Sequence, residues 1–253
     1  MKNLIIHGHR GSRGTSPENT LPSFQEAADA GADYVELDVH FSKEKILVVF
    51  HDYEISGRIC RDAKGLSVIE PKLLSELSIA EIKTYDCGRP DAKIPTLEEL
   101  VLWKKKNAPK MRLNVEIKND VKLDVNGDHG KVLAKATLSL LGKHDLLDET
   151  LVQSFDHRIV DALRQLNSKV KLSCLFEDEA DFAVVTKAHQ AQVAAVHFSL
   201  LKKEQVDLCK SLGLEVLPWT VNEEKDWKRM IEIGVTSIIT DFPKKLADFR
   251  HEA

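Results

Sequence analysis

Short apolar segments alternate with longer amphipathic segments along most of the chain, and this rhythm constrains the fold more than any other feature. It predicts parallel β-strands connected by α-helices. The eight predicted strands cover Leu4–His9, Tyr34–Val39, Arg112–Lys118, Leu151–Phe155, Val170–Phe176, Ala194–Ser199, Glu215–Thr220 and Ser237–Thr240. The helices are predicted at Asn19–Ala30, Leu97–Lys106, Gly130–Leu141, Arg158–Leu166, Glu179–His189, Lys203–Leu212, Glu223–Ile233 and Lys244–Arg250.

Eight strand–helix units in 253 residues are typical of an α/β TIM (β/α)8 barrel. A doubly wound open sheet is the alternative, but it ordinarily has fewer strands and a Gly-rich turn after the first one. No G-x-G-x-x-G follows Leu4–His9. The second unit is much longer than the others and contains an extra strand at Ile46–Phe50. We therefore expect residues 1–253 to form a single TIM-barrel domain, with a small insertion at about residues 53–95.

The composition narrows the class of protein. Hydrophobic residues make up 43% and charged residues 30% of the chain, as in soluble globular proteins. With 36 basic and 40 acidic residues the net charge is −4, so a nucleic-acid partner is not expected. The chain has no apolar stretch of membrane-spanning length and no signal-type segment at its N-terminus. We therefore expect a cytoplasmic protein without integral membrane association, and a homodimer is one option for its oligomeric state.

The cysteines are few and widely spaced. Cys60, Cys87, Cys174 and Cys209 form no C-x-x-C motif and show no obvious pairing. Spacings of this kind indicate reduced thiols rather than disulfides or a zinc site.

Strand alternation places acidic residues inside the predicted barrel. In the second and third strands, apolar residues of one parity suit the helix-facing side, so the other parity faces inward. The outward residues are Val35, Leu37, Val39, Leu113, Val115 and Ile117. The inward residues are Tyr34, Glu36, Asp38, Asn114, Glu116 and Lys118. Three carboxylates are therefore expected to converge near the C-terminal ends of the strands, where TIM barrels have their active sites.

Three neighbouring carboxylates do not all remain ionised without a cation, because like charges raise one another's pKa. Their oxygen donors favour a hard divalent ion, Mg²⁺ or Ca²⁺, with Mn²⁺ as a further option. With such an ion and the nearby Arg10 and Lys118, the site would carry about one net positive charge and attract a phosphodiester anion. Hydrolysis of that ester needs an acid and a base, for which His9 and His51 are candidates at the ends of their strands.

Each of these residues also has a structural interpretation. Glu36 and Asp38 could lie on a solvated edge, and Glu116 with Lys118 could form a cross-strand ion pair. His9 could be a hydrogen-bonded residue at the end of a strand, and Trp219 could fill the core. Two further histidines are close to the predicted site. His7 lies one layer deeper than His9 and is expected to be structural, whereas His197 fits a core role or a pocket role equally well.

Several motifs occur together in a fixed order along nearly the whole chain. They are His9-Arg10-Gly11, Pro17-Glu18-Asn19-Thr20, Glu36-Leu37-Asp38-Val39, His51-Asp52, Glu116-Ile117-Lys118, Ser154-Phe155-Asp156, Trp219-Thr220-Val221-Asn222 and Thr240-Asp241-Phe242-Pro243. In this set the sequence resembles the glycerophosphodiester phosphodiesterases, metal-dependent enzymes of the phospholipase C-like TIM-barrel superfamily. A departure is Gly8 before His9, where alanine is common in that family, together with the unusual His7.

The resemblance implies a role for each site residue. It implies metal ligation by Glu36, Asp38 and Glu116, and general acid–base catalysis by His9 and His51. Substrate binding would fall to Arg10 and Lys118, which contact the phosphate, and to Trp219, which offers a flat wall to the glycerol. Glu18 and Asn19 would brace the loop that carries His9 and Arg10, with Asn19 also serving as N-cap of the first helix.

The resemblance also implies the reaction. The expected activity is metal-dependent hydrolysis of glycerophosphodiesters, such as glycerophosphocholine or glycerophosphoethanolamine, to sn-glycerol 3-phosphate and an alcohol. One alternative is a lysophospholipase D or sphingomyelinase D-like phosphodiesterase, which would need an exposed apolar entry to the barrel mouth. Another is a non-catalytic phosphate-ligand binding protein, which is disfavoured because all five metal and histidine positions are filled. The sequence does not distinguish attack by water from attack by the glycerol hydroxyl through a cyclic phosphate.

Overall fold

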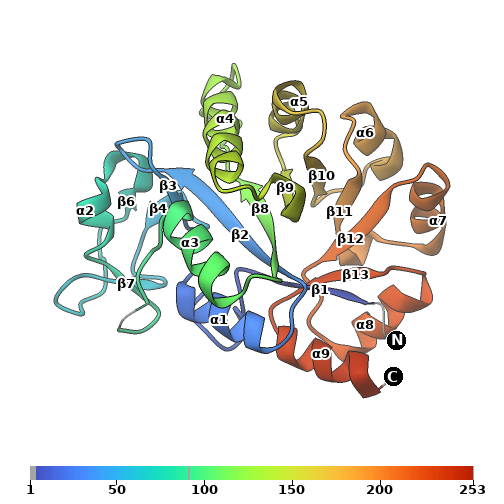
Figure 1. Cartoon of the computed structure of the whole chain (residues 1–253), viewed down its shortest axis with the longest axis horizontal. Coiled ribbons are helices and arrows are strands. Elements are labelled where there is room, and N and C mark those ends of the chain that lie inside the picture. The colour runs from blue at the N-terminus through green and yellow to red at the C-terminus, as the bar shows by residue number, and fades with distance from the viewer. Residues whose placement is uncertain (1–3, 91, 253) are drawn as a thin grey trace.

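The computed structural model describes residues 4–90 and 92–252, and its central feature is a parallel sheet that curves into a nearly closed barrel (Figure 1). The barrel strands are β1 (Ile5–Gly8), β2 (Tyr34–Phe41), β8 (Arg112–Ile117), β9 (Thr150–Ser154), β10 (Lys171–Phe176), β11 (Val193–His197), β12 (Glu215–Trp219) and β13 (Ser237–Thr240). They lie in the order β12-β11-β10-β9-β8-β2-β1-β13. At the seam, Val221 N–H donates to the Ile239 carbonyl at 2.9 Å. The predicted TIM barrel is confirmed.

Helices follow the barrel strands and cover the outside of the sheet (Figure 1). They are α1 (Leu21–Asp29), α3 (Leu97–Asn107), α4 (Asp128–Lys143), α5 (His157–Leu166), α6 (Phe182–Ala188), α7 (Lys203–Ser211), α8 (Glu224–Glu232) and α9 (Pro243–Glu252). Short 3₁₀ turns, η2 (Leu147–Glu149) and η3 (Phe198–Leu200), precede β9 and α7. No helix in the described part of the chain combines the length and hydropathy of a membrane span.

The start of α1 corrects the sequence prediction. The N-cap is Thr20, whose hydroxyl accepts a hydrogen bond from Ser23 N–H at 3.4 Å, and not Asn19. Asn19 instead has a φ of +56° and directs its amide to the Asp38 carboxylate. Asparagine tolerates this left-handed conformation better than most residues, so the chain can turn there before the helix begins.

The predicted alternation of side chains is confirmed in β2 and β8. The outward residues Val35, Leu37, Val39, Leu113, Val115 and Ile117 belong to the main apolar core under the helices. Inside the barrel, a second cluster contains Ile5, Tyr34, Leu151, Leu175, Leu217 and Ile239. This inner cluster fills the lower part of the barrel, so the polar inward residues of β2 and β8 lie above it, towards the C-terminal ends of the strands.

The insertion lies between β2 and α3. It begins with β3 (Leu47–Val49), antiparallel to β2, and continues through β4 (Glu54–Ile55), β5 (Cys60–Arg61), β6 (Lys72–Leu73), η1 (Leu74–Glu76), α2 (Ile79–Ile82) and β7 (Asp86–Cys87). Strand β4 pairs with β6, and β5 pairs with β7. A separate apolar cluster that includes Phe50, Ile55, Ile82 and Tyr85 supports these short elements, which form one flank of the barrel in Figure 1.

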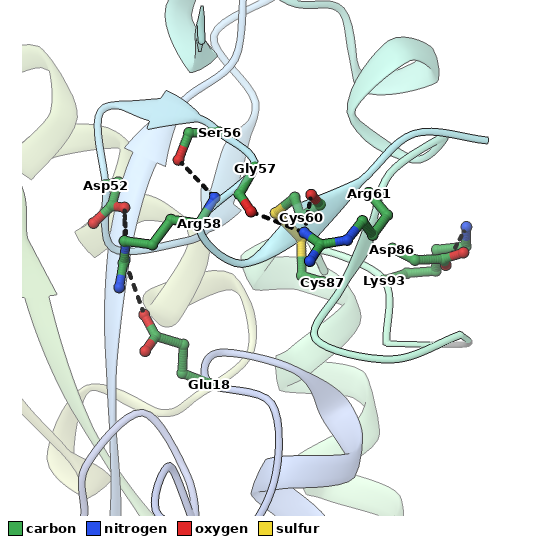
Figure 2. The surroundings of a disulfide bond; sticks show 10 residues. All are labelled: Glu18, Asp52, Ser56, Gly57, Arg58, Cys60, Arg61, Asp86, Cys87 and Lys93. Carbon is green, nitrogen blue, oxygen red and sulfur yellow. Dashed lines mark hydrogen bonds and ion pairs between the residues drawn. A yellow bond between two sulfur atoms is a disulfide. The ribbon is translucent and has the colours of Figure 1, made fainter. Parts of the chain in front are cut away.

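A disulfide closes the insertion and contradicts the prediction that all cysteines are reduced. Cys60 and Cys87 are bonded across β5 and β7, with their Cα atoms 4.1 Å apart (Figure 2). Antiparallel pairing places the two residues directly opposite each other although 27 positions separate them in the sequence. Spacing along the chain does not reveal that pairing. Cys174 and Cys209 are buried and free, as predicted.

The disulfide leads to a thiol count that can be measured. Denatured, non-reduced protein should react with two equivalents of a thiol reagent, and reduced protein with four, because only Cys174 and Cys209 are free. Replacing both bonded cysteines by serine should lower the free energy of unfolding by about 2–4 kcal/mol, through the greater freedom of the unfolded chain. Urea unfolding of the variant and of reduced wild type measures this loss. Four reactive thiols without reductant would contradict the disulfide.

Candidate active site

The C-terminal ends of the barrel strands surround a cavity of about 880 Å³. Seven of the residues singled out in the sequence line this cavity: His9, Arg10, Glu36, His51, Glu116, Lys118 and Trp219. Asp38, Glu18 and Asn19 lie directly behind this lining, in contact with Arg10 or with one another. The cavity therefore occupies the end of the barrel where TIM-barrel enzymes carry out their chemistry.

Three buried carboxylates meet at one side of the cavity. Parallel pairing of β2 with β8 sets Asp38 opposite Glu116, and Glu36 lies two residues earlier on the same face. One oxygen from each of Glu36, Asp38 and Glu116 lies within 4.8 Å of the other two. Asp38 Oδ1 is buried and has no hydrogen-bond partner among the described residues. An unpartnered oxygen within an all-carboxylate donor set fits a hard divalent cation.

Burial and mutual repulsion govern the protonation of this cluster. Burial, followed by the charges of Asp38 and Glu116, raises the pKa of Glu36 well above its usual range. Burial also raises the pKa of Glu116, although the Lys118 ammonium opposes the shift. Burial disfavours the charged form of Asp38 too, but Arg10 and then Lys118 outweigh it and lower the pKa of this carboxyl. The protein's own charges thus favour the ionised form of Asp38 and disfavour that of Glu36, and a bound cation would stabilise the ionised form of all three carboxylates.

Two cations lie against the carboxylates and face the cavity. The backbone N–H of Arg10 donates to Glu36 Oε2 at 2.9 Å, and the Nε of its guanidinium lies 3.4 Å from Asp38 Oδ2. Lys118 Nζ lies 2.8 Å from Glu116 Oε1 and 3.8 Å from Asp38 Oδ1. The pKa of Lys118 is raised, because these two carboxylates outweigh the effect of its burial. Both groups therefore carry positive charge where an anionic substrate would enter.

Each histidine of the cavity is held by an aspartate. His9 Nδ1 lies 2.6 Å from Asp241 Oδ1, and His9 Nε2 lies 4.0 Å from Glu36 Oε2. His51 Nδ1 lies 2.7 Å from Asp52 Oδ1. A carboxylate that accepts the Nδ1 proton leaves Nε2 as the proton acceptor of a neutral imidazole. Burial lowers the pKa of His9 although its hydrogen bond to Asp241 opposes the shift, and the lowered pKa favours this neutral form.

The two aspartates were not assigned a role from the sequence. The hydrogen bond to His9 helps to lower the pKa of Asp241 to about 2 against the effect of burial. Arg13 Nη1 donates to Asp241 Oδ2 at 3.3 Å and also lines the cavity. The hydrogen bond with His51 is the main cause that lowers the pKa of Asp52. The sequence signal that could have identified both aspartates is their place in the motifs His51-Asp52 and Thr240-Asp241.

Glu18 and Asn19 join the loop after β1 to the carboxylate cluster. Glu18 accepts hydrogen bonds from Arg10 Nη1 at 2.9 Å and from Arg13 Nε at 2.8 Å. Asn19 Nδ2 donates to Asp38 Oδ2 at 2.8 Å. These contacts fix both the loop and the orientation of Asp38, and their importance for activity stays a prediction.

Aromatic residues form the opposite wall of the cavity. Trp219 donates its Nε1–H to the Ala195 carbonyl at 3.1 Å and packs edge-to-face against Phe155, with ring centroids 5.4 Å apart. His197 lies behind Trp219, where its ring contacts the indole and Nδ1 bonds Ser199, and it is not among the lining residues. The structure therefore assigns His197 to support of the wall.

His7 is buried below the cavity. Its ring stacks on Tyr34 with centroids 4.2 Å apart, and its nitrogens are within hydrogen-bond distance of Asn114 and Ser237. Burial, with smaller effects from Arg112 and Lys171, lowers the pKa of His7 to about 3. This is a neutral structural histidine, which is the role that its depth in the strand predicted.

A charged, histidine-flanked cavity at this end of a TIM barrel places the protein among the barrel enzymes that act on phosphate esters. Residues 9–245 match the model of the Glycerophosphoryl diester phosphodiesterase family, and the chain belongs to this family. It is 29% identical to a glycerophosphodiester phosphodiesterase of Caldanaerobacter subterraneus subsp. tengcongensis, over 97% of each chain. It is 25% identical to the Lysophospholipase D GDPD1 of Rattus norvegicus, over 95% of this chain and 84% of that protein.

Solved structures show the same architecture. A glycerophosphodiester phosphodiesterase from Parabacteroides distasonis superimposes with a TM-score of 0.84 at 26% identity, covering 99% of this chain and 98% of that one. A phosphodiesterase from Oleispira antarctica, solved in complex with the product sn-glycerol-3-phosphate, also has a TM-score of 0.84, at 25% identity and with the same coverage. These likenesses agree with the family assignment and identify the protein as an enzyme.

The buried His7 predicts a pH dependence of stability. Its folded-state pKa of about 3 lies below the value of 6.5 for an exposed histidine, so the unfolded chain binds a proton first as the pH falls. His7 should therefore cost about 2 kcal/mol of folding stability between pH 6.5 and pH 5. Urea unfolding at several pH values should show a smaller loss for His7→Gln than for wild type. Identical pH dependence in the two proteins would contradict this assignment.

Proposed function

We propose that this enzyme hydrolyses glycerophosphodiesters, such as glycerophosphocholine or glycerophosphoethanolamine, to sn-glycerol 3-phosphate and an alcohol. The observation that carries the proposal is the meeting of Glu36, Asp38 and Glu116 at one side of a cavity that two aspartate-bonded histidines also line. The Oleispira antarctica relative in complex with sn-glycerol-3-phosphate supports the identity of the product. The name of the Caldanaerobacter relative supports the class of substrate.

The three carboxylates would hold one divalent ion, and Mg²⁺ or Ca²⁺ suits their oxygen donors best, with Mn²⁺ as a further option. When bound, such an ion polarises a phosphoryl oxygen and stabilises the charge that develops on it. The Asp38 oxygen without a hydrogen-bond partner and the raised pKa values of both glutamates support this assignment, because a cation would supply that partner and offset the repulsion between the carboxylates.

In this proposal the chain's own residues bind the anion and move protons. Arg10 and Lys118 attract and orient the phosphodiester, and the wall of Trp219 receives the glycerol. One of the two imidazoles, His9 or His51, accepts the proton of the attacking hydroxyl through Nε2, and the other protonates the departing alkoxide. Analysis of the products for a cyclic glycerophosphate distinguishes an attacking glycerol hydroxyl from an attacking water.

The first test is release of glycerol 3-phosphate by the purified protein. Glycerophosphocholine and glycerophosphoethanolamine should be cleaved in the presence of Mg²⁺ or Ca²⁺, and not after treatment with a chelator, because no ion would then polarise the phosphoryl oxygen. Adding the metal back should restore the rate. Coupled detection of glycerol 3-phosphate, with metal titrated by calorimetry in parallel, measures both effects. The proposal would be refuted if none of the glycerophosphodiesters tested released glycerol 3-phosphate in a metal-dependent way.

The second test addresses the two histidines. His9→Ala and His51→Ala should each lower kcat by about 10²- to 10⁴-fold, the usual share of a general acid or base. His189→Ala is a matched control, since this histidine bonds Asp161 and packs on His157 away from the cavity lining, and the change should leave kcat near the wild-type value. Steady-state kinetics with glycerophosphocholine measure the three variants. An unchanged kcat in either cavity variant would exclude that residue from proton transfer.

A lysophospholipase D activity is the second candidate, and one observation favours it. In the segment after β8, Val121, Leu123 and Val125 are 52%, 81% and 74% exposed, and Val121 lines the cavity. Such side chains offer an apolar edge at the barrel mouth for a single acyl chain, and the relative in Rattus norvegicus is named for this activity. Lysophosphatidylcholine micelles in the same assay decide between the candidates. The sphingomyelinase D-like alternative gains no such support.

Three further expectations complete the proposal. We propose that residues 1–253 act as one domain that includes the insertion. A homodimer stays a prediction, for which light scattering is the measurement. A cytoplasmic location also stays a prediction, and the Cys60–Cys87 disulfide bears on it because reducing compartments keep thiols reduced. Alkylation of thiols in freshly lysed cells shows which state the pair has there.

A further inference from the structure

The insertion contributes one cationic side chain to the surroundings of a cavity histidine. Arg58 Nη2 and Nε donate to Asp52 Oδ2 at 2.7 and 3.2 Å, and the other oxygen of Asp52 accepts from His51 Nδ1 at 2.7 Å. Figure 2 shows the Arg58 side chain reaching from the disulfide loop towards Asp52 and Glu18. We propose that Arg58 is a positioning residue for the reaction, which fixes the Asp52 carboxylate and through it the orientation of His51.

The two histidine–aspartate pairs of the cavity differ in how firmly they are held. Asp241 receives hydrogen bonds from Arg13 and from Asn222 Nδ2, the latter at 2.8 Å, in addition to its bond with His9. Asp52, in the described part of the chain, has Arg58 as its one side-chain donor besides His51. Its side chain is also more exposed, at 27% against 11% for Asp241. Loss of one arginine should therefore affect the His51 pair more than loss of Arg13 affects the His9 pair.

The disulfide and its neighbours hold the loop that presents Arg58. Cys60, two residues further along, is bonded to Cys87, and Gly88 N–H donates to the Ile59 carbonyl at 2.7 Å. Gly88 has a φ of +88° and lies so close to Pro17 that a Cβ would come within 2.9 Å of that ring. The insertion thus packs against the segment that carries Glu18, and Arg58 Nη2 lies 3.9 Å from Glu18 Oε1.

The exposure of this arginine separates a positioning role from a stabilising one. The Arg58 side chain is 50% exposed, and ion pairs at such sites contribute little to folding stability. Two donors of one planar guanidinium on the same oxygen instead restrict the direction of the carboxylate, which a lysine reproduces only in part. The residue is also absent from the cavity lining, so it acts through Asp52 rather than on the substrate.

The test compares Arg58→Gln and Arg58→Lys with Arg61→Gln, in the full chain with the disulfide intact. Arg61 lies in the same loop, but among residues 4–90 and 92–252 its side chain donates to the backbone carbonyls of Gly57 and Cys60 and to no carboxylate, so it is the matched control. Arg58→Gln should lower kcat for glycerophosphocholine by about 10- to 100-fold, with a much smaller change in KM. Arg58→Lys should recover part of the loss, and Arg61→Gln should resemble wild type. In an Asp52→Asn background, Arg58→Gln should add little.

A spectroscopic readout keeps this inference separate from the proposed function, on which its kinetic part rests. In ¹⁵N NMR of the imidazoles, the Nδ1 resonance of His51 should shift in Arg58→Gln and remain in place in Arg61→Gln, whether or not the protein cleaves glycerophosphocholine. An unchanged His51 resonance in Arg58→Gln would overturn the inference. So would a loss confined to KM, or a loss that adds in full to that of Asp52→Asn. Inactive wild type with the expected NMR shift would refute the function and not the positioning role.

Discussion

The structure depends on the parallel register of β2 and β8, which sets three carboxylates beside one another in the barrel interior. Asp38 faces Glu116 directly, and Glu36 lies two residues before Asp38 on the same face. Such a cluster is unfavourable by itself, because burial and repulsion raise the pKa values of both glutamates. The barrel tolerates it because Arg10 and Lys118 lie against the same oxygens, and because a hard cation would complete the set. The buried carboxylates and the two cations of the site therefore stabilise one another's charged forms.

Further ion pairs and hydrogen bonds hold the arginines and histidines around the cavity in place. Glu18 links the guanidinium groups of Arg10 and Arg13, and Arg13 in turn contacts the aspartate that holds His9. A comparable connection reaches His51 from the other side, through Asp52 and Arg58. Both imidazoles thus end a chain of ion pairs that passes close to the same glutamate. This arrangement gives each histidine a fixed tautomer and direction, as acid–base chemistry on one phosphodiester requires.

The insertion contacts the residues that hold the cavity histidines. Its apolar cluster and its disulfide hold a short loop against the segment after β1, where Gly88 meets Pro17. The barrel provides the carboxylates and His9 on strands or directly after them, whereas His51 follows the short strand β3. Residues outside the barrel strands therefore supply the contacts of His51, one of the two histidines proposed to transfer protons.

The sequence by itself determined the barrel, the parity of β2 and β8, and part of the cavity lining, including Glu36, Glu116 and Lys118. The reason is that alternation and strand order are local patterns, so Val35 and Leu37 reveal the direction of Glu36 and Asp38 without any knowledge of distant contacts. Only the tertiary structure decided the partners of these residues. Asp241 lies 232 positions from His9, and Cys60 pairs with Cys87 because two short antiparallel strands bring them together. Contacts of this kind arise from chain folding in space, and no spacing or periodicity along the chain records them.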